Sequence, residues 1–195
     1  MTLLDLEPAA KRMADLIAGV APDSLDAPTP CPKYSLGDLV DHVGGLSLAF
    51  TAAATKAMGG DTAQAPSPAA SRLGKDWRTR IPGELAALAE AWRDPAAWSG
   101  FTQAGGVDLP GEIAGLVALD ELVIHGWDIA RASGQAYECD PPTLAAVYEF
   151  VAPMAAPGHE APRIFGPVVE VPEDAPLLDR IIGLSGRDPA WPTGS

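Results

Sequence analysis

The sequence predicts a fold that is all α-helical or mostly so. Alanine and leucine are frequent, while aromatic residues make up only 6% of the 195 residues. β-Branched and aromatic residues do not gather in alternating runs, as they would in strands. Apolar residues recur every three or four positions in several segments, most regularly in residues 113–132. With 47% hydrophobic residues, a chain of this length suits one well-buried core, so a single domain spanning residues 1–195 is expected.

The first helix is expected from residue 2 to about residue 20, where Gly19 and Pro22 mark its end. Its apolar positions recur at helical spacing: Leu3, Leu6, Ala10, Met13, Ile17 and Val20. Several prolines between residues 22 and 34 then favour an extended connecting loop.

The second helix is expected to begin after Ser35 and to run to about Met58. Ser35 and Asp38 have the spacing of a capping box, in which each side chain bonds the other residue's backbone N–H. The stripe facing the core carries one histidine among apolar residues: Leu39, His42, Leu46, Ala49 and Ala53. Gly44 and Gly45 cost about 1 kcal/mol each relative to alanine inside a helix, which favours close approach of another helix or a ligand.

The middle of the chain alternates loops and helices. Residues 59–68 are rich in glycine, alanine, proline and polar residues, which is typical of an exposed loop. A third helical region spans residues 69–92 and is expected to be kinked or interrupted near Pro82. Residues 93–109 break the helical spacing, which predicts a short extended piece or a hairpin. The fourth helix is expected over residues 110–134.

Shorter helices and a proline-rich tail are expected after the fourth helix. Residues 143–154 predict a short helix, and residues 177–184 add a last helical turn or two. Six prolines between residues 153 and 176 favour an ordered tail that wraps over the surface.

The charge of the chain excludes some partners. A formal net charge of −13 argues against nucleic acid and anionic membranes, because binding them requires clustered lysine and arginine. The densest basic group is Arg72, Lys75, Arg78 and Arg80. We interpret this group as a solvated helix face, with an anion-binding patch as the alternative.

The termini and cysteines indicate a cytoplasmic protein with reduced thiols. The first residues are acidic and lack the basic region and apolar run of a secretory signal. No segment has the roughly 20 uninterrupted apolar residues of a membrane span. Cys31 lies between two prolines and outside any C-x-x-C pattern, so we interpret it as a small buried residue and not as a nucleophile.

Polar residues interrupt the apolar stripe of the fourth helix. Glu121, His125 and Asp128 are separated by four and three residues, so a helix places them one turn apart along one face. His42 takes the corresponding place on the second helix. Two imidazoles and one carboxylate are ligands that Zn²⁺ accepts, and they leave positions open for water or substrate. We therefore predict a divalent-metal site at His42, Glu121 and His125.

Other interpretations of these residues stay open from spacing alone. Asp128 either holds an imidazole N–H from behind the ligands or is an extra ligand. The alternative to a metal site is that His42 and His125 are core histidines with satisfied hydrogen bonds. His159, in the proline-rich tail, is expected to be exposed unless it reaches the site from above.

Several common catalytic motifs are absent from the sequence. It contains no H-E-x-x-H, no phosphate-binding G-x-x-x-x-G-K-[ST], no G-x-G-x-x-G after a strand and no G-x-S-x-G. Metalloprotease, nucleotide-dependent and serine-hydrolase functions are therefore disfavoured.

Three stretches carry a resemblance to a known family: Thr29-Pro-Cys-Pro32 leading into Leu36-Gly-Asp-Leu-Val-Asp-His-Val-Gly-Gly45, then Glu121-Leu-Val-Ile-His-Gly-Trp-Asp-Ile-Ala-Arg131, and Leu184-Ser-Gly-Arg-Asp-Pro-Ala-Trp191. The chain resembles the DinB-like superfamily. More narrowly, it is similar to single-domain actinobacterial metal-binding proteins related to the N-terminal domain of mycothiol-dependent maleylpyruvate isomerase. The resemblance implies a four-helix bundle holding zinc or nickel, with the family's ligands falling on His42, Glu121 and His125.

The resemblance also implies a class of chemistry. We expect a metal- and thiol-dependent transferase or isomerase in which the metal activates a thiol of the mycothiol type. The isomerase's C-terminal domain has no counterpart in the resemblance, so maleylpyruvate is not the expected substrate. The expected partners are a small-molecule thiol and an electrophilic substrate, with a homodimer left open and with neither nucleic acid nor membrane. The alternatives are a non-catalytic metal- or ligand-binding module related to stress, and a metal-dependent hydrolase.

Overall fold

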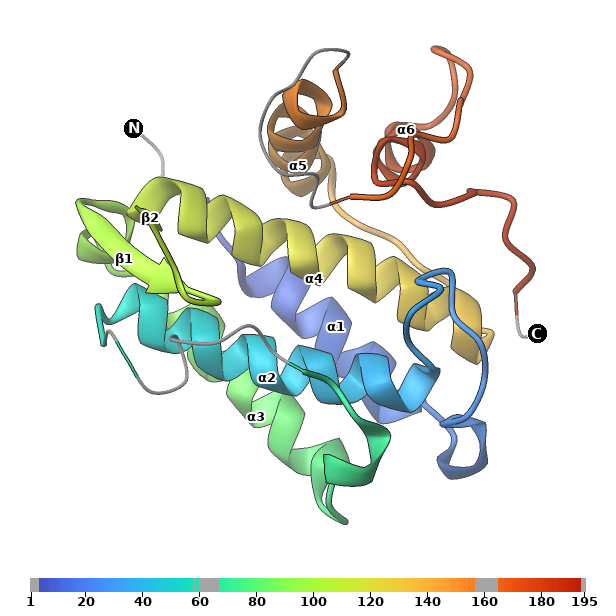
Figure 1. The fold of residues 1–195 in the computed structure, drawn as a ribbon, viewed down its shortest axis with the longest axis horizontal. Coiled ribbons are helices and arrows are strands. Elements are labelled where there is room, and N and C mark those ends of the chain that lie inside the picture. The colour runs from blue at the N-terminus through green and yellow to red at the C-terminus, as the bar shows by residue number, and fades with distance from the viewer. Residues whose placement is uncertain (1–3, 58, 60–66, 157–164, 194–195) are drawn as a thin grey trace.

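Four helices form a bundle in the computed structural model, which describes residues 4–57, 59, 67–156 and 165–193 (Figure 1). They are α1 (Glu7–Gly19), α2 (Leu36–Ala54), α3 (Trp77–Ala91) and α4 (Gly111–Ser133). Going around the bundle, the order is α1, α3, α2, α4, and each helix packs against the two beside it. The expectation of an all-α, four-helix bundle is confirmed.

The bundle encloses one cluster of buried apolar side chains. Its largest fully buried members come from all four helices and their connections: Leu6, Met13, Leu16, Ile17, Leu36, Leu39, Ile81, Leu85, Leu88, Trp92, Leu119 and Ile129. Burying one such aliphatic side chain contributes about 1.5–3 kcal/mol. This core holds α2 and α4 side by side, and these two helices carry the predicted site residues.

A capping box starts α2, as the sequence predicted. Asp38 N–H donates to Ser35 Oγ over 3.2 Å, and Ser35 N–H donates to Asp38 Oδ2 over 3.1 Å. The helix ends at Ala54, earlier than the predicted end at Met58, which lies outside the described residues. Lys56 has a φ of 58°, a left-handed conformation that does not continue a helix.

Gly44 allows α2 to approach α3 closely. A Cβ built on Gly44 would lie 3.3 Å from Cγ1 of Ile81 on α3. That distance is tighter than most real Cβ contacts, so a larger residue would require Ile81 to shift. Of the two explanations offered for the glycine pair, a neighbouring helix therefore accounts for Gly44.

The third helix begins later than predicted. The expected helical region from residue 69 breaks into a short 3-10 turn, Ala70–Arg72, and α3, which begins at Trp77. Gly74 separates the two with a φ of 71°. Pro82 removes one backbone donor but does not end α3, which runs through it to Ala91.

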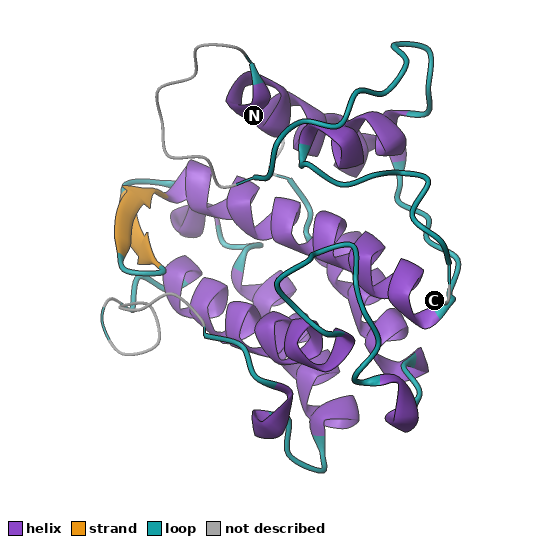
Figure 2. Ribbon diagram, turned by 45° about the vertical axis from the view of Figure 1, so that its right-hand side comes forward, coloured by secondary structure: helices purple, strands orange, loops and turns teal. Residues whose placement is uncertain are grey.

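A β-hairpin connects α3 to α4, after a 3-10 turn at Pro95–Trp98. Strand β1 (Phe101–Ala104) pairs antiparallel with β2 (Val107–Pro110). Gly105 and Gly106 form its two-residue turn with φ of 58° and 80°, and positive φ at both positions is the requirement of a type I′ turn. The hairpin predicted within residues 93–109 is therefore present, and it is the orange element in Figure 2.

The C-terminal part adds α5 (Pro141–Ala155) and α6 (Leu177–Leu184), which pack against each other, with α5 also on α4 (Figure 1). The predicted helix at residues 143–154 is thus slightly longer, and the one at 177–184 has the predicted bounds. Of the predicted tail between residues 153 and 176, residues 157–164 lie outside the described part. Among the described helices, none combines the length and apolar composition of a membrane crossing.

Candidate metal centre

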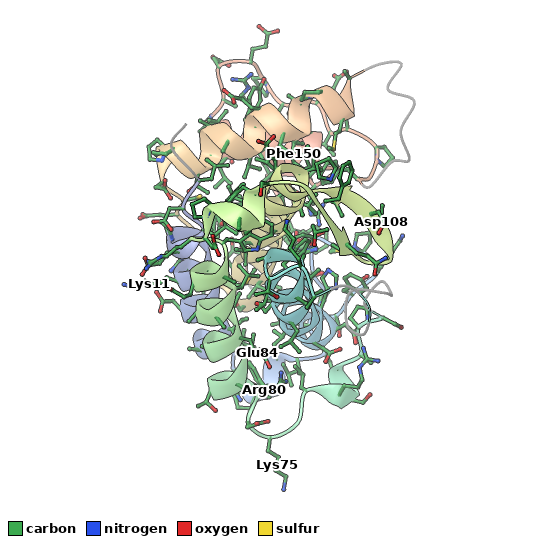
Figure 3. The ribbon with its side chains drawn as sticks, turned by 90° about the vertical axis from the view of Figure 1, so that its left-hand side faces the viewer. Lys11, Lys75, Arg80, Glu84, Asp108 and Phe150 are labelled. Atoms are coloured by element: carbon green, nitrogen blue, oxygen red, sulfur yellow. The ribbon has the colours of Figure 1, made fainter. Side chains whose placement is uncertain are left out.

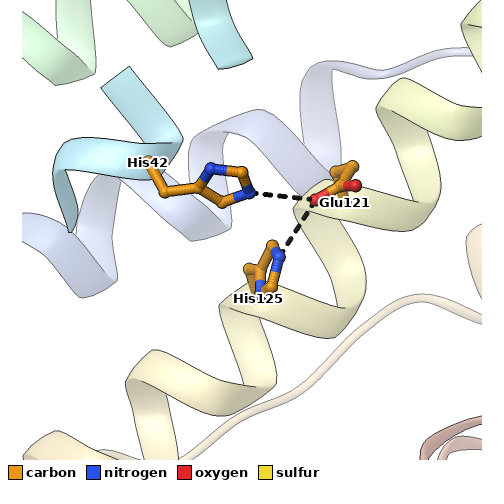
Figure 4. A group of neighbouring side chains, drawn as sticks. All are labelled: His42, Glu121 and His125. Carbon is orange, nitrogen blue, oxygen red and sulfur yellow. Dashed lines mark ion pairs between the residues drawn. The ribbon is translucent and has the colours of Figure 1, made fainter. Parts of the chain in front are cut away.

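The three residues predicted as metal ligands meet between α2 and α4 (Figure 4). His42 projects from α2, while Glu121 and His125 lie one turn apart on α4. Glu121 Oε2 is 3.0 Å from His125 Nε2 and 3.6 Å from His42 Nε2. One ligand atom from each residue lies within 4.8 Å of the other two. Their role as ligands stays a prediction, and the distances between the three atoms can be compared with those of known zinc sites.

The donor set fits a divalent ion of the zinc class. With metal–ligand bonds of about 2.1 Å, tetrahedral geometry places ligand atoms roughly 3.4 Å apart. The two measured separations, 3.0 Å and 3.6 Å, lie on either side of that value. Glu121 Oε2 is buried and lies between the two imidazole Nε2 atoms, with which it forms an ion pair when a histidine is protonated. A buried carboxylate charge is costly without a compensating positive charge, which a cation between the three atoms would supply.

The charges at this centre favour a proton on His125 when no metal is bound. Burial alone lowers the pKa of His125, but the Glu121 and Asp128 carboxylates outweigh it and raise this pKa to about 9. Burial likewise raises the pKa of Glu121, but the two histidines, His125 above all, hold it well below its usual range. A metal ion would replace the proton as the positive charge that this carboxylate requires.

Asp128 supports His125 from the opposite side of the imidazole ring. Its Oδ2 lies 2.9 Å from His125 Nδ1, whereas Glu121 lies near Nε2. Asp128 is fully buried; burial raises its pKa, but the hydrogen bond from His125 and the charge of Arg187 lower it below the ordinary value. An ionised Asp128 accepts a hydrogen bond from the Nδ1–H of His125, which leaves Nε2 to face a metal. Of the two interpretations of Asp128, this geometry favours support over ligation.

Comparison with known proteins places the bundle in a family. The profile of the mycothiol maleylpyruvate isomerase N-terminal domain matches residues 6–130, which contain His42, Glu121, His125 and Asp128. The chain belongs to this family. Two uncharacterized proteins of Mycobacterium tuberculosis, one from each of two strains, are 29% identical to it over 185 residues, covering 92% of this chain and 93% of theirs. No solved structure matches it significantly.

In this member of the mycothiol maleylpyruvate isomerase N-terminal family, the candidate metal centre opens into a cavity of about 450 Å³. It is lined by the loop 30–34, by His42 of α2, by the middle of α4, and by the C-terminal segments 165–167 and 185–187. A cavity of this size accommodates a small molecule. The C-terminal wall lies outside residues 6–130, so this chain completes its site with residues that the family profile does not cover.

Two further titratable groups, Cys31 and Asp120, line this cavity. Burial raises the pKa of the half-buried Cys31 thiol, and the Asp128 carboxylate raises it further. Cys31 is therefore a poor nucleophile at neutral pH, in agreement with the sequence-based interpretation. Asp120 is buried, its Oδ1 has no hydrogen-bond partner, and burial raises its pKa well above the ordinary value. The sequence analysis did not single out Asp120, because it lies beside Glu121 and carries no motif of its own.

The basic group does not form one helix face, contrary to the prediction. Arg72 belongs to the 3-10 turn and pairs with Asp41 at 2.9 Å, while Arg80 on α3 pairs with Glu84 at 2.8 Å. Figure 3 shows Lys75 extending away from the bundle and Arg80 beside Glu84.

Its remaining arginine is also engaged. Arg78 donates to the Val20 carbonyl over 2.6 Å and lies over the Trp77 ring. Arg72 and Arg80 do line a hollow of about 440 Å³ on the other side of His42. Because each is paired with a carboxylate there, the geometry gives no support to an anion-binding patch. His159 lies outside the described residues.

Proposed function

We propose that this protein is a metal-dependent enzyme that uses a small thiol of the mycothiol type to attack an electrophilic substrate. The observation that carries the proposal is the meeting of the buried Glu121 Oε2 with two imidazole Nε2 atoms at the wall of an open cavity. Membership of a family named for a mycothiol-dependent isomerase supports a thiol as one of the molecules that the cavity receives.

The residues of the centre have separate proposed roles. His42, Glu121 and His125 would hold the ion and leave a position toward the cavity, while Asp128 keeps the His125 proton on Nδ1. When bound, a divalent ion would lower the pKa of a coordinated thiol, so that thiolate is present at neutral pH.

The reaction proposed for the thiol is an addition to an electrophilic carbon. Its proton leaves to solvent, and a new S–C bond forms with the sulfur electron pair. In a transfer, the bond from that carbon to a leaving group breaks, and the leaving group takes the electron pair. In an isomerisation, a conjugated double bond opens on attack, rotates as a single bond, and forms again as the same thiolate departs. The raised pKa of Cys31 supports an external thiol in preference to this residue as the sulfur donor.

Two measurements test the proposal. Protein purified without chelator or added metal should contain close to one divalent ion per chain by elemental analysis. His125→Ala should lose this ion, whereas Glu112→Gln, which changes an exposed carboxylate on the same helix, should keep it. A His125→Ala variant with unchanged metal content would refute the centre.

The thiol-dependent step is tested with the metal-loaded protein. Conjugation of a chromogenic electrophile should require mycothiol and metal together, and it should be absent from His125→Ala. If metal is bound and no electrophile gives a thiol-dependent product, the protein is a non-catalytic binding module and not an enzyme. If water cleaves the substrate without any thiol, the protein is instead a metal-dependent hydrolase.

A further inference from the structure

The segment that follows α6 places a guanidinium group against the carboxylate behind the metal centre. Arg187 Nε donates to Asp128 Oδ1 over 3.0 Å, and Arg187 Nη2 donates to Asp128 Oδ2 over 2.9 Å. The Arg187 side chain is 10% exposed and that of Asp128 is fully buried. Two parallel bonds between a planar guanidinium and a carboxylate fix the orientation of both groups.

The same carboxylate orients a predicted ligand. Asp128 Oδ2 accepts from Arg187 and lies 2.9 Å from His125 Nδ1, so one oxygen joins the two side chains. The other nitrogen of that imidazole, Nε2, points to Glu121 Oε2 at 3.0 Å. An unbroken series of contacts therefore leads from the C-terminal segment to the centre.

We propose that Arg187 is a positioning residue of the metal centre. It holds Asp128 in the orientation that keeps the His125 proton on Nδ1 and presents Nε2 to the ion. The inference rests on the metal centre of the proposed function but not on its thiol chemistry. It makes the residues after α6 part of the site, although the family match ends at residue 130.

A purely structural role for Arg187 would be to fasten the tail to the bundle, and a second arginine separates the two roles. Arg131 of α4 donates to the Pro189 carbonyl over 2.7 Å and to Thr193 Oγ1 over 2.9 Å. It fastens the same tail to the same helix, and its hydrogen bonds go to the tail and not to Asp128 or His125. Arg131→Gln is therefore the matched control for Arg187→Gln.

The test measures binding of Co²⁺ and Zn²⁺ alone to the full-length apoprotein, with no thiol present. Affinities come from competition with a chelator, and the visible bands of bound Co²⁺ report the geometry of its ligands. Arg187→Gln should weaken binding by about 10- to 100-fold, as loss of a group behind a metal ligand does, and it should alter the Co²⁺ bands. Arg131→Gln should bind within about twofold of the wild type with an unchanged spectrum.

Arg187→Lys keeps the positive charge beside buried Asp128 but cannot form the two-bond fork. It should fold and should still bind more weakly than the wild type, so it decides the question if Arg187→Gln does not fold. Wild-type affinity and spectrum in folded Arg187→Lys would overturn the inference. Equal weakening in Arg131→Gln would overturn it as well, because tail fastening would then explain the effect. A wild-type protein that binds neither ion would instead refute the metal centre itself.

Discussion

The charge of Glu121 should set the protonation of His125 in the metal-free protein. We expect His125 in the apoprotein to titrate with a pKa of about 9, against an ordinary value of 6.5. Replacing Glu121 with glutamine removes the largest influence that raises this pKa, and an opposite charge at this distance is worth about 1–3 pH units. The pKa of His125 should therefore fall by that amount in Glu121→Gln, because only Asp128 then opposes the lowering of the pKa by burial.

The size of the effect follows from the same shift. The difference between about 9 and 6.5 corresponds to about 3 kcal/mol, at roughly 1.4 kcal/mol per pH unit. Because the folded-state pKa is raised, this contribution to apoprotein stability is fully present below about pH 6.5. It is lost as the pH rises through about 9.

The assay is an NMR titration of the imidazole signals of apoprotein prepared by chelator dialysis. The chain has only three histidines, so single variants assign the signals. Glu112→Gln, which removes a distant carboxylate from α4, should leave the pKa of His125 near 9. A wild-type His125 that titrates at or below 6.5, or an unchanged pKa in Glu121→Gln, would refute this account of the site's electrostatics.

Five further outcomes follow from the structure. Metal affinity measured by chelator competition should rise up to about tenfold per pH unit toward pH 9, because the ion displaces the His125 proton; a flat profile would contradict this. Ser35→Ala should lower the free energy of unfolding by about 1 kcal/mol in urea titrations, since it removes the α2 cap. Gly115→Ala should cost about 1–3 kcal/mol, because its Cβ would lie 2.5 Å from Trp98 Cζ3, whereas Gly83→Ala, which meets nothing within 4 Å, should stabilise α3 by up to about 1 kcal/mol. Leu85→Ala should cost about 2–5 kcal/mol by leaving a cavity in the core.

Local patterns were sufficient where one element determines the outcome. The bounds of α4 agree with prediction within a residue or so, because a long apolar repeat lies between Pro110 and Gly134, whose φ of 72° ends the helix. The spacing of Glu121 and His125 likewise places both side chains on one stripe of that helix. The start of α3 was predicted too early because helical spacing alone does not reveal that Gly74 turns left-handed.

Contacts between distant segments were harder to predict. That His42 would face Glu121 depends on α2 and α4 being neighbours, which spacing within either helix does not determine. The sequence analysis inferred the pairing from the two histidines on core-facing stripes, and the family resemblance supported it. Arg187 reaches Asp128 across 59 positions from a loop without periodicity. The sequence analysis quoted its stretch as part of the resemblance but assigned it no role. Such a contact exists only once α5 has packed on α4 and α6 has packed on α5.

The placement of the three candidate ligands on two helices far apart in the sequence has a thermodynamic consequence. An ion held by His42 together with Glu121 and His125 would act as a cross-link between α2 and α4, comparable to a disulfide that closes a long loop. The unfolded chain cannot present the three atoms together, so unfolding and metal release would become a single event. At a free metal concentration 1,000 times the dissociation constant, this linkage adds about 4 kcal/mol. The melting temperature of this bundle would then report how much metal the surroundings supply.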